Sequence, residues 1–437
     1  MKCFVGIDLG STTTKAIILD DGQHIMGRGI TNSRSNYDLA AAVAKSEAFI
    51  DARFSLLERR CEDLEHTEEI FARLENAFRF QQYLEQLEHF ERHLRETICD
   101  ARHKADEALL ADFAAQFRAE ALDYGRTLYL GETAPKSDFF RDLAGLTFNR
   151  VAKEFARSRS YPFDTLLGLF DKCIIRVENE MMEHGFADNI RAALATVHPN
   201  GAVGQRLARE IDAVCSIELE EVCTVGTGYG RQRLPFPKEQ IRSEILCHGL
   251  GAHYMFPHTA TVLDIGGQDT KAIQVDGQGI VTSFQMNDRC AAGCGRYLGY
   301  IAEEMNLSLP ELGPMAMTAG KAVKINSTCT VFAGAELRDR LSDGQKREDI
   351  LLGLHKAIMY RAMSLLARSG GISNEFTFTG GVAKNEAATA AVRELIAENY
   401  GPDVVINIAP DSIYTGALGA AIFAHREAHR EQAEAPA

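Results

Sequence analysis

The sequence predicts an α/β protein made of two related halves, with a long helical insertion in the first half. Three observations favour this fold class. A ten-residue pattern occurs twice, the stretch 31–124 contains neither glycine nor proline, and a glycine pair follows a β-rich run near residue 380. The chain has 437 residues, which is long enough for two or three domains.

The repeated pattern defines the two halves. "DLGSTTTKAI" begins at Asp8, "DIGGQDTKAI" begins at Asp264, and six of the ten residues are identical without a gap. In each copy an apolar, strand-like run ends in an aspartate, a glycine permits a tight turn, and a second apolar run returns. Such turns expose backbone N–H groups that bind anions. Facing each other, two of them would hold a polyphosphate, with both aspartates toward Mg²⁺; two purely structural hairpins are the alternative.

A third glycine motif is "FTFTGGVAKNE", from Phe376 to Glu386. A β-rich run meets Gly380 and Gly381, and a helix is expected to follow, so the backbone can approach a flat ligand such as a nucleoside. The chain has no Walker-type phosphate loop. The three motifs, in this order, resemble the actin/Hsp70/sugar-kinase ATPase superfamily, whose two α/β halves close over Mg-ATP.

The insertion is strongly helical. Apolar residues recur at helical spacing from Ile70 through Leu74 and Phe78 to Ile98, with Glu and Arg between them. We interpret its charged face as solvated, with a docking arm for a partner subunit as the alternative. The expected domains are residues 1–45 and 205–261 for the first half, 46–204 for the helical insertion, 262–426 for the second half, and 427–437 for a flexible tail.

Composition restricts the partners. The net charge of −14 argues against nonspecific binding to nucleic acid or to an anionic membrane. The sequence contains no run of about 18 apolar residues, so it predicts no membrane span. Its N-terminus begins a strand-like run and shows no signal-peptide pattern. Ten cysteines in such a chain are typical of a reducing compartment. We therefore expect a cytoplasmic protein that contacts neither nucleic acid nor membrane.

Three cysteines follow the second repeat. Cys290 and Cys294 lie in "NDRCAAGCGRYL", and Cys329 lies in "STCTVFA", each before an amphipathic helical run. A helix N-terminus favours the thiolate form. Three kinds of cysteine site are disfavoured. Cys290 and Cys294 form a C-x-x-x-C pair and not a redox C-x-x-C pair, and three cysteines are too few for the four ligands of zinc. A catalytic thiol requires a nearby base, and no histidine lies close in sequence. An iron–sulfur cluster usually has four cysteines, which two related chains could supply together. Buried packing cysteines remain an alternative.

These segments, with "TGYGR" and "GGVAKNE", resemble the BadF/BadG/BcrA/BcrD ATPase family. The family includes activators of 2-hydroxyacyl-CoA dehydratases and the electron-activating subunits of ATP-dependent benzoyl-CoA reductase. The resemblance implies one [4Fe-4S] cluster between two subunits, each contributing two cysteines, here Cys290 and Cys329. Cys294 departs from the pattern and is left outside the cluster. The resemblance covers residues 1–45 and 217–425, and the insertion resembles the larger ATPase subunit of benzoyl-CoA reductase.

The resemblance implies a function in anaerobic aromatic degradation. The chain would couple ATP hydrolysis to low-potential electron transfer from ferredoxin, through the shared cluster, to the catalytic subunits of benzoyl-CoA reductase. Its cluster-sharing partner would be a shorter paralogous ATPase subunit. The alternatives are a homodimeric activator of a 2-hydroxyacyl-CoA dehydratase, a small-molecule kinase of the same fold, and a nucleotide-dependent scaffold.

The same motifs indicate the site residues. Asp264 and Gln268 are expected to polarise the attacking water, with Asp8 at the Mg²⁺. The expected nucleotide contacts are Gly10, Ser11, Thr12, Thr13 and Lys15 in the first turn, Gly266, Gly267, Asp269 and Lys271 in the second, and Gly380, Gly381, Lys384 and Asn385 in the third motif.

Overall fold

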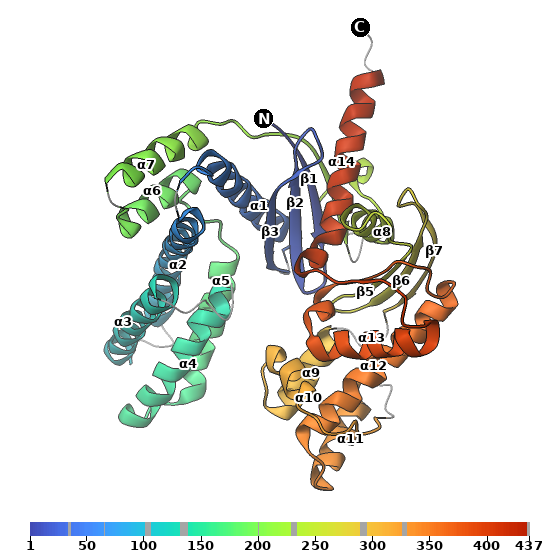
Figure 1. Ribbon diagram of the computed structural model, residues 1–437. Coiled ribbons are helices and arrows are strands. Elements are labelled where there is room, and N and C mark those ends of the chain that lie inside the picture. The colour runs from blue at the N-terminus through green and yellow to red at the C-terminus, as the bar shows by residue number, and fades with distance from the viewer. Residues whose placement is uncertain are drawn as a thin grey trace. The chain divides into compact units, whose positions relative to one another are not determined.

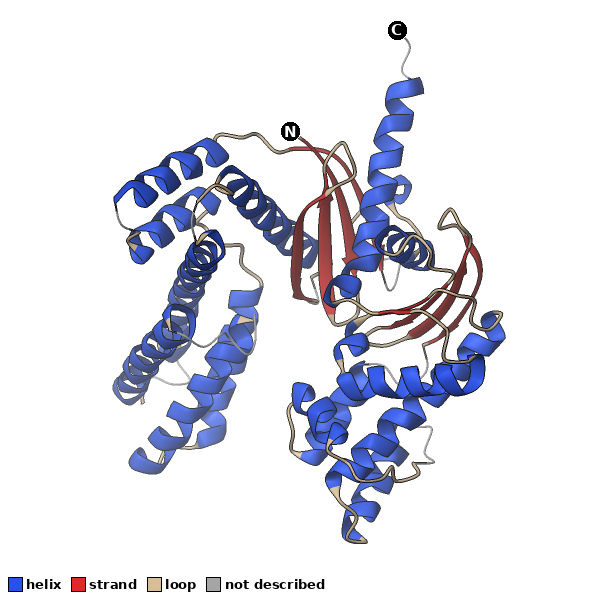
Figure 2. Cartoon of the chain, in the orientation of Figure 1, coloured by secondary structure: helices blue, strands red, loops and turns tan. Residues whose placement is uncertain are grey.

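The computed structural model (Figures 1 and 2) describes residues 1–33, 36–64, 66–100, 106–131, 139–199, 201–228, 234–288, 295–325 and 330–434. The chain divides into two compact units. One unit combines Met1–Phe49 with Leu219–Ala437, and the other is Ile50–Glu218. Helix α1 (Tyr37–Arg60) contains the boundary between them. The first unit contains both copies of the repeated pattern.

The first unit begins with a four-stranded sheet in the order β3-β2-β1-β4. Its strands are β1 (Lys2–Leu9), β2 (Thr13–Leu19), β3 (Ile25–Asn32) and β4 (Glu220–Gly228). β1 to β3 form an antiparallel meander, and β4 pairs with β1 in parallel. The register places Asp8 opposite Lys15. Helix α14 (Thr415–Glu434) packs on this sheet, with α8 (Glu244–Met255) against it (Figure 1).

The second sheet repeats this arrangement in the order β7-β6-β5-β8-β9. Its strands are β5 (Thr261–Ile265), β6 (Thr270–Val275), β7 (Val281–Asn287), β8 (Phe376–Thr379) and β9 (Ile406–Asn407). β5 to β7 are antiparallel, and β8 pairs with β5 in parallel. The register places Asp264 opposite Lys271, as Asp8 lies opposite Lys15 in the first sheet. The two sheets are therefore structural copies of one another.

Five helices accompany the second sheet and share a continuous apolar core with it. They are α9 (Gly295–Met305), α10 (Leu312–Met317), α11 (Thr330–Ser342), α12 (Arg347–Ser369) and α13 (Glu386–Tyr400). Among the described residues of the unit, the short 3₁₀ turns are η2 (Lys238–Gln240), η3 (Leu309–Glu311), η4 (Gly381–Lys384) and η5 (Pro410–Tyr414). By length and composition α12 could cross a membrane, but 61% of its apolar window is buried inside the protein. The core helix of a globular protein passes the same test.

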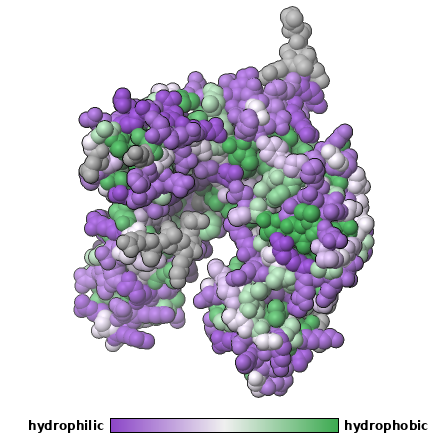
Figure 3. All heavy atoms as spheres, viewed as in Figure 1, coloured by the Kyte–Doolittle hydropathy of each residue, from purple (hydrophilic) through white to green (hydrophobic). Residues whose placement is uncertain are grey.

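The second unit is helical (Figure 2). Its helices are α2 (Thr67–Ile98), α3 (Glu107–Leu130), α4 (Phe140–Arg159), α5 (Phe163–Glu178), α6 (Phe186–Val197) and α7 (Gly201–Cys215). Aromatic rings dominate its core, where Phe148 contacts Phe113 and Phe117 edge to face at centroid distances of 5.1 Å. Hydrophilic side chains cover much of its visible surface (Figure 3). This division of apolar and charged faces agrees with the helical periodicity of the sequence.

Candidate active site

The turns of the two repeated hairpins approach each other within the first unit. A Cβ atom added to Gly267 would clash with Thr12 Oγ1 and lie 3.0 Å from Ser11 Oγ. Any larger residue at position 267 would therefore force the Thr12 side chain of the opposite turn to move. Because both turns carry backbone N–H groups where the strands end, their approach creates one polar site between the two halves.

The first turn is fixed by Ser33, which follows β3. The Ser33 backbone N–H donates to the Thr12 carbonyl at 2.8 Å, and its hydroxyl donates to the Gly10 carbonyl at 2.5 Å. Lys15 is held loosely, since its Nζ lies 3.9 Å from Asp8 Oδ2 and its side chain is 15% exposed. This lysine therefore keeps part of its hydrogen-bonding capacity for another anion.

The matching lysine of the second turn is held tightly. Lys271 is 1% exposed, and its Nζ lies 2.8 Å from Asp269, 3.0 Å from Glu244 and 3.5 Å from Asp264. Burial alone would lower the pKa of Lys271, but these three carboxylates raise it above its usual value. The ammonium group is therefore charged, and it balances negative charge inside the protein.

Asp264 is an ionised carboxylate in an almost fully buried position. Thr379 Oγ1 donates to its Oδ1 at 2.8 Å, and His248 Nδ1 lies 3.5 Å from the same oxygen. Burial alone would raise the pKa of Asp264, but His248, Lys271 and the Thr379 hydrogen bond together lower it to about 2. At neutral pH this group can bind a cation or accept a hydrogen bond from water.

Two side chains of α8 complete the site and were not predicted from the sequence. Glu244 and His248 lie one helical turn apart, and their ligand atoms and those of Asp8 all lie within 4.8 Å of one another. His248 Nδ1 also lies 3.2 Å from Thr415 Oγ1. Burial raises the pKa of Glu244, although Lys271 and His248 oppose the shift. The available sequence signal was the four-residue spacing of an acid and a histidine on one helical face.

Two buried carboxylate oxygens of this site lack a hydrogen-bond donor among the described residues. They are Asp8 Oδ1 and Asp269 Oδ2. A buried carboxylate oxygen without a partner is unfavourable, so a cation or ordered water is expected beside each. Mg²⁺ prefers carboxylate oxygens and water, and both are compatible with this site. The residues present therefore fit the hydrated Mg²⁺ ion that accompanies a nucleotide.

The third glycine motif lies beside the second hairpin. Gly380 has a positive φ of 87°, and a Cβ atom there would lie 3.0 Å from Asp264 Oδ1 and clash with the Ile265 carbonyl. Gly381 begins η4, which ends at the exposed Lys384. The Asn385 side chain accepts a hydrogen bond from the Ala388 backbone N–H at 3.0 Å and caps α13.

The structure thus brings several predicted residues together. Asp8, Asp264, Asp269 and Lys271 share one buried charge network with Glu244 and His248. Gln268 lies half-buried in the turn between β5 and β6. The predicted cluster ligands Cys290 and Cys329, and also Cys294, lie outside the described residues, and the helices after them begin at Gly295 and Thr330.

Two solved structures share this fold. Component A of (R)-2-hydroxyglutaryl-CoA dehydratase from Acidaminococcus fermentans has a TM-score of 0.55 and 24% identity, with 98% of this chain and 100% of that chain covered. The activator of 2-hydroxyisocaproyl-CoA dehydratase from Clostridium difficile, solved with bound ADPNP, has a TM-score of 0.52 and 22% identity, with 100% and 98% covered. The predicted duplicated fold of the actin/Hsp70/sugar-kinase type, with a helical insertion, is confirmed.

The family to which this chain belongs is one of ATPases. A family model matches residues 5–424, and the chain belongs to the BadF/BadG/BcrA/BcrD ATPase family. The resemblance seen in the cysteine and glycine motifs is thereby confirmed at the level of the family, and so is the expectation of an ATP-binding protein.

Curated relatives include proteins of two kinds. The activator of lactoyl-CoA dehydratase from Anaerotignum propionicum is 38% identical over 245 residues, which are 56% of this chain and 92% of the relative. The (R)-2-hydroxyglutaryl-CoA dehydratase activating ATPase of Acidaminococcus fermentans is 42% identical over 205 residues, 47% of this chain and 76% of the relative. A subunit of benzoyl-CoA reductase from Thauera aromatica is 32% identical over 206 residues, 47% of this chain and 71% of the relative.

Proposed function

We propose that this chain is an electron-activating ATPase subunit. It binds Mg-ATP between the two hairpins and couples hydrolysis to low-potential electron transfer through a [4Fe-4S] cluster that it shares with a second subunit. The observation that carries this proposal is the meeting of the Thr12 and Gly267 turns above the buried carboxylates Asp8 and Asp264. The site occurs in a family whose relatives include named activators and a reductase subunit.

The two lysines of the repeat take different roles in this proposal. Lys271 is saturated by three carboxylates, so it holds Asp264 and Asp269 in place. Lys15 is partly exposed and weakly paired, so it is the lysine that can turn toward a phosphate. The backbone N–H groups of both turns contact phosphate oxygens, and Gly380 and Gly381 border the nucleoside.

In this proposal the carboxylates and the turn residues contact Mg²⁺ and orient the attacking water. Asp8, with an unpartnered buried oxygen, contacts the hydrated Mg²⁺ ion. Asp264 and Gln268 orient the attacking water, and Glu244 and His248 position the carboxylates of the two halves. Mg²⁺ supplies charge neutralisation at the phosphates when it is bound. These roles place one aspartate of each repeat at the reacting phosphate.

Hydrogen bonds join the nucleotide turn to α9, the helix that follows the cysteine segment in the sequence. The first two residues of α9, Gly295 and Arg296, donate their backbone N–H groups to the carbonyls of Gly266 and Gly267 at 2.9 Å each. A change in the second turn with nucleotide state therefore pulls on the helix that follows Cys290. Cys290 and Cys329 supply two cluster ligands, and the partner subunit supplies the other two. This coupling would change the exposure of the cluster.

The acceptor proposed first is the catalytic module of benzoyl-CoA reductase, with ferredoxin as donor and a shorter paralogue as the cluster-sharing subunit. The helical unit supports this choice. Only 56% of this chain aligns with the lactoyl-CoA dehydratase activator, although 92% of that activator is covered, so this chain is considerably longer than the activator. The higher identities to dehydratase activators favour the second candidate, a homodimeric activator of a 2-hydroxyacyl-CoA dehydratase. Both candidates place the chain in the cytoplasm.

The test is anaerobic purification with the chains that co-purify, followed by EPR after reduction, with and without Mg-ATP. We expect a [4Fe-4S] signal that responds to nucleotide, disappears in Cys290→Ala and persists in Cys223→Ala, which alters a thiol on β4. Adding benzoyl-CoA reductase subunits or a 2-hydroxyacyl-CoA dehydratase then identifies the acceptor. Absence of iron and of the signal, with a partner subunit present, would refute the shared cluster.

A further inference from the structure

Two helices that follow the predicted cluster cysteines in the sequence pack against each other. They are α9, which comes after Cys290, and α11, which comes after Cys329. Ile301 of α9 is fully buried and Leu337 of α11 is 1% exposed, and both belong to the apolar core of the second half. The two helices therefore form one packed layer, although other elements separate them in the sequence.

The contacts between these helices show that they run in the same direction. A Cβ atom added to Gly334 of α11 would lie 2.7 Å from the Tyr300 hydroxyl of α9. Four residues further along each helix, the Arg338 guanidinium donates to the Glu304 carboxylate. Because both contacts advance together by about one helical turn, α9 and α11 are parallel and begin at nearly the same level. Their first turns therefore lie next to each other.

Tyr300 joins the packing contact to the polar contact. Its ring lies against Gly334, where the missing side chain permits the close approach, and its hydroxyl accepts from Arg338 and donates to Glu304. The hydrogen bonds from Arg338 and Tyr300 hold the pKa of Glu304 below its usual value. An exposed ion pair alone stabilises little, but this one adds to a close helix contact and a shared core. We therefore expect α9 and α11 to move together.

The second nucleotide turn reaches this helix pair through α9. The backbone N–H groups of Gly295 and Arg296 donate to the carbonyls of Gly266 and Gly267 at 2.9 Å each. The N–H groups in the first turn of a helix have no partner within the helix, so the nucleotide turn acts as its cap. A displacement of this turn would therefore shift α9, and α9 would carry α11 with it.

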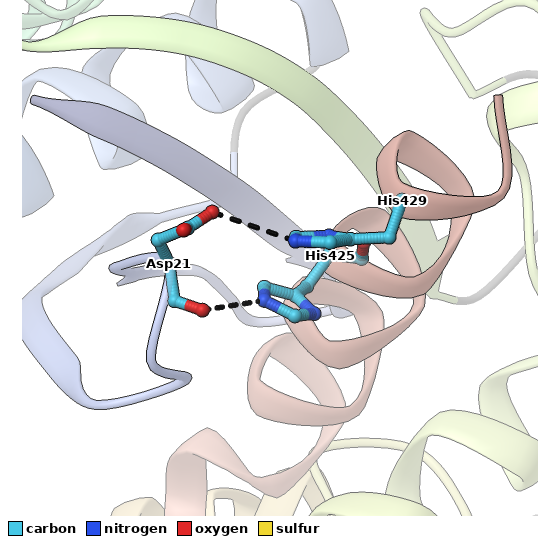
Figure 4. Close-up of side chains that lie close together, drawn as sticks. All are labelled: Asp21, His425 and His429. Carbon is cyan, nitrogen blue, oxygen red and sulfur yellow. Dashed lines mark hydrogen bonds and ion pairs between the residues drawn. The ribbon is translucent and has the colours of Figure 1, made fainter. Parts of the chain in front are cut away.

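The first hairpin is attached to a different helix. His425 of α14 donates from Nε2 to the Asp21 carbonyl in the β2–β3 turn at 2.9 Å, and the His429 ring stacks on His425 at 4.1 Å (Figure 4). His429 Nε2 also lies 3.5 Å from the Asp21 carboxylate. These contacts tie the first hairpin to α14, which is not part of the helix pair. Exchange in α14 therefore serves as an internal reference for α9 and α11.

We propose that α9 and α11 respond to the nucleotide as one rigid pair, and that Tyr300, Gly334 and Arg338 are the positioning residues that couple α11 to α9. In the proposed function, on which this step rests, the second turn changes with nucleotide state. The coupling extends that change from the helix after Cys290 to the helix after Cys329. Both proposed cluster ligands would then be displaced together, and not one at a time.

The test is hydrogen–deuterium exchange of the full-length chain, measured by mass spectrometry with and without a non-hydrolysable ATP analogue and Mg²⁺. In the wild type we expect the analogue to change exchange in both α9 and α11. Arg338→Ala removes the polar contacts, and Gly334→Leu pushes the Tyr300 ring away, so each variant should keep the α9 response and lose most of the α11 response. Arg340→Ala is the matched control, because the partners of Arg340 are Glu336 of the same helix at 3.4 Å and the Lys324 carbonyl at 3.3 Å.

The four chains should share one midpoint of thermal unfolding and the same exchange in α14, which would show that the fold is intact. If Gly334→Leu lowers the midpoint, Arg338→Ala decides alone, since its side chain is 57% exposed. A wild-type response in α9 without one in α11, or equal α11 responses in all four chains, would overturn the proposal.

Two further measurements separate this coupling from the proposed function. Calorimetry measures binding of the analogue, and iron content is determined on the same anaerobic preparation. Binding without a response in either helix would overturn the coupling alone. A chain that binds the analogue and shows the paired response, but holds no iron with its partner subunit present, would refute the shared cluster and leave the helix pair standing.

Discussion

Replacing Lys271 with methionine should destabilise the ATPase unit strongly. Methionine keeps most of the volume of the buried side chain but removes the ammonium that contacts Asp269 at 2.8 Å, Glu244 at 3.0 Å and Asp264 at 3.5 Å. Removing one partner of a buried ion pair costs about 3–5 kcal/mol, because the remaining charge stays buried without compensation. Lys271 is 1% exposed, so we expect the free energy of unfolding to fall by an amount in this range.

The repeat offers a matched control at the aligned position. Lys15→Met makes the same chemical change in the first hairpin, where Nζ lies 3.9 Å from Asp8 and the side chain is 15% exposed. We expect a loss below about 1 kcal/mol there. Urea unfolding without nucleotide should be followed by hydrogen exchange in β1, β2, β5 and β6, because the helical unit contributes its own transition. Equal losses in the two variants would refute the assignment of Lys271 as a buried counter-ion.

The same network predicts a pH dependence with a defined sign. The pKa of Asp264 is lowered from 3.8 to about 2 in the folded chain, so its ionised form stabilises the fold above pH ~4. This contribution is lost as the pH falls through about 2, and it amounts to about 2–3 kcal/mol at 1.36 kcal/mol per pKa unit. In Lys271→Met the loss between pH ~4 and ~2 should be smaller, because one cause of the lowered pKa is gone. An unchanged loss in the variant would contradict this coupling.

Two glycine substitutions test the packing of each unit. Gly267→Ala should weaken binding of a non-hydrolysable ATP analogue at least about tenfold, measured by calorimetry, because the added Cβ would clash with Thr12. Gly277→Ala is the control, because a Cβ there meets open space, and this variant should bind the analogue as the wild type does. Equal affinities would show that the two turns do not have to approach. Gly125→Ala would clash with the Tyr83 ring and should cost about 1–3 kcal/mol in the helical unit, measured by circular dichroism, without changing nucleotide affinity. An unchanged melting curve would show that the Tyr83 ring can move to accommodate the added methyl group.

The two hairpins could be predicted because their structure is determined locally. Each copy contains its own strand, turn glycine and returning strand, so the pairing of Asp8 with Lys15 and of Asp264 with Lys271 follows from ten consecutive residues. The helical unit could be predicted for the same reason, since its apolar period lies within single helices. Local patterns of this kind do not depend on where distant segments pack.

The different ion pairing of the two lysines could not be predicted in full in this way. The second copy has Asp269 where the first has Thr13, and this difference is visible in the sequence. Lys271 also gains Glu244 from α8, a helix that precedes the second repeat. His248, from the same helix, likewise reaches Asp264 at 3.5 Å. These contacts depend on the packing of α8 between segments far apart in the chain. Comparison of the two repeats cannot find them, because α8 belongs to neither copy.

The supports of the two turns differ in a way that bears on the proposed coupling. Ser33, which follows β3, holds the first turn through hydrogen bonds to the Gly10 and Thr12 carbonyls. The backbone amides of Gly295 and Arg296 hold the second turn, and both belong to α9, the helix after Cys290. A nucleotide that moves both turns equally would therefore displace a helix that follows a cysteine in the second half alone. In the proposed function, this asymmetry would couple the nucleotide to the second half of the duplicated chain, which contains the proposed cluster ligands.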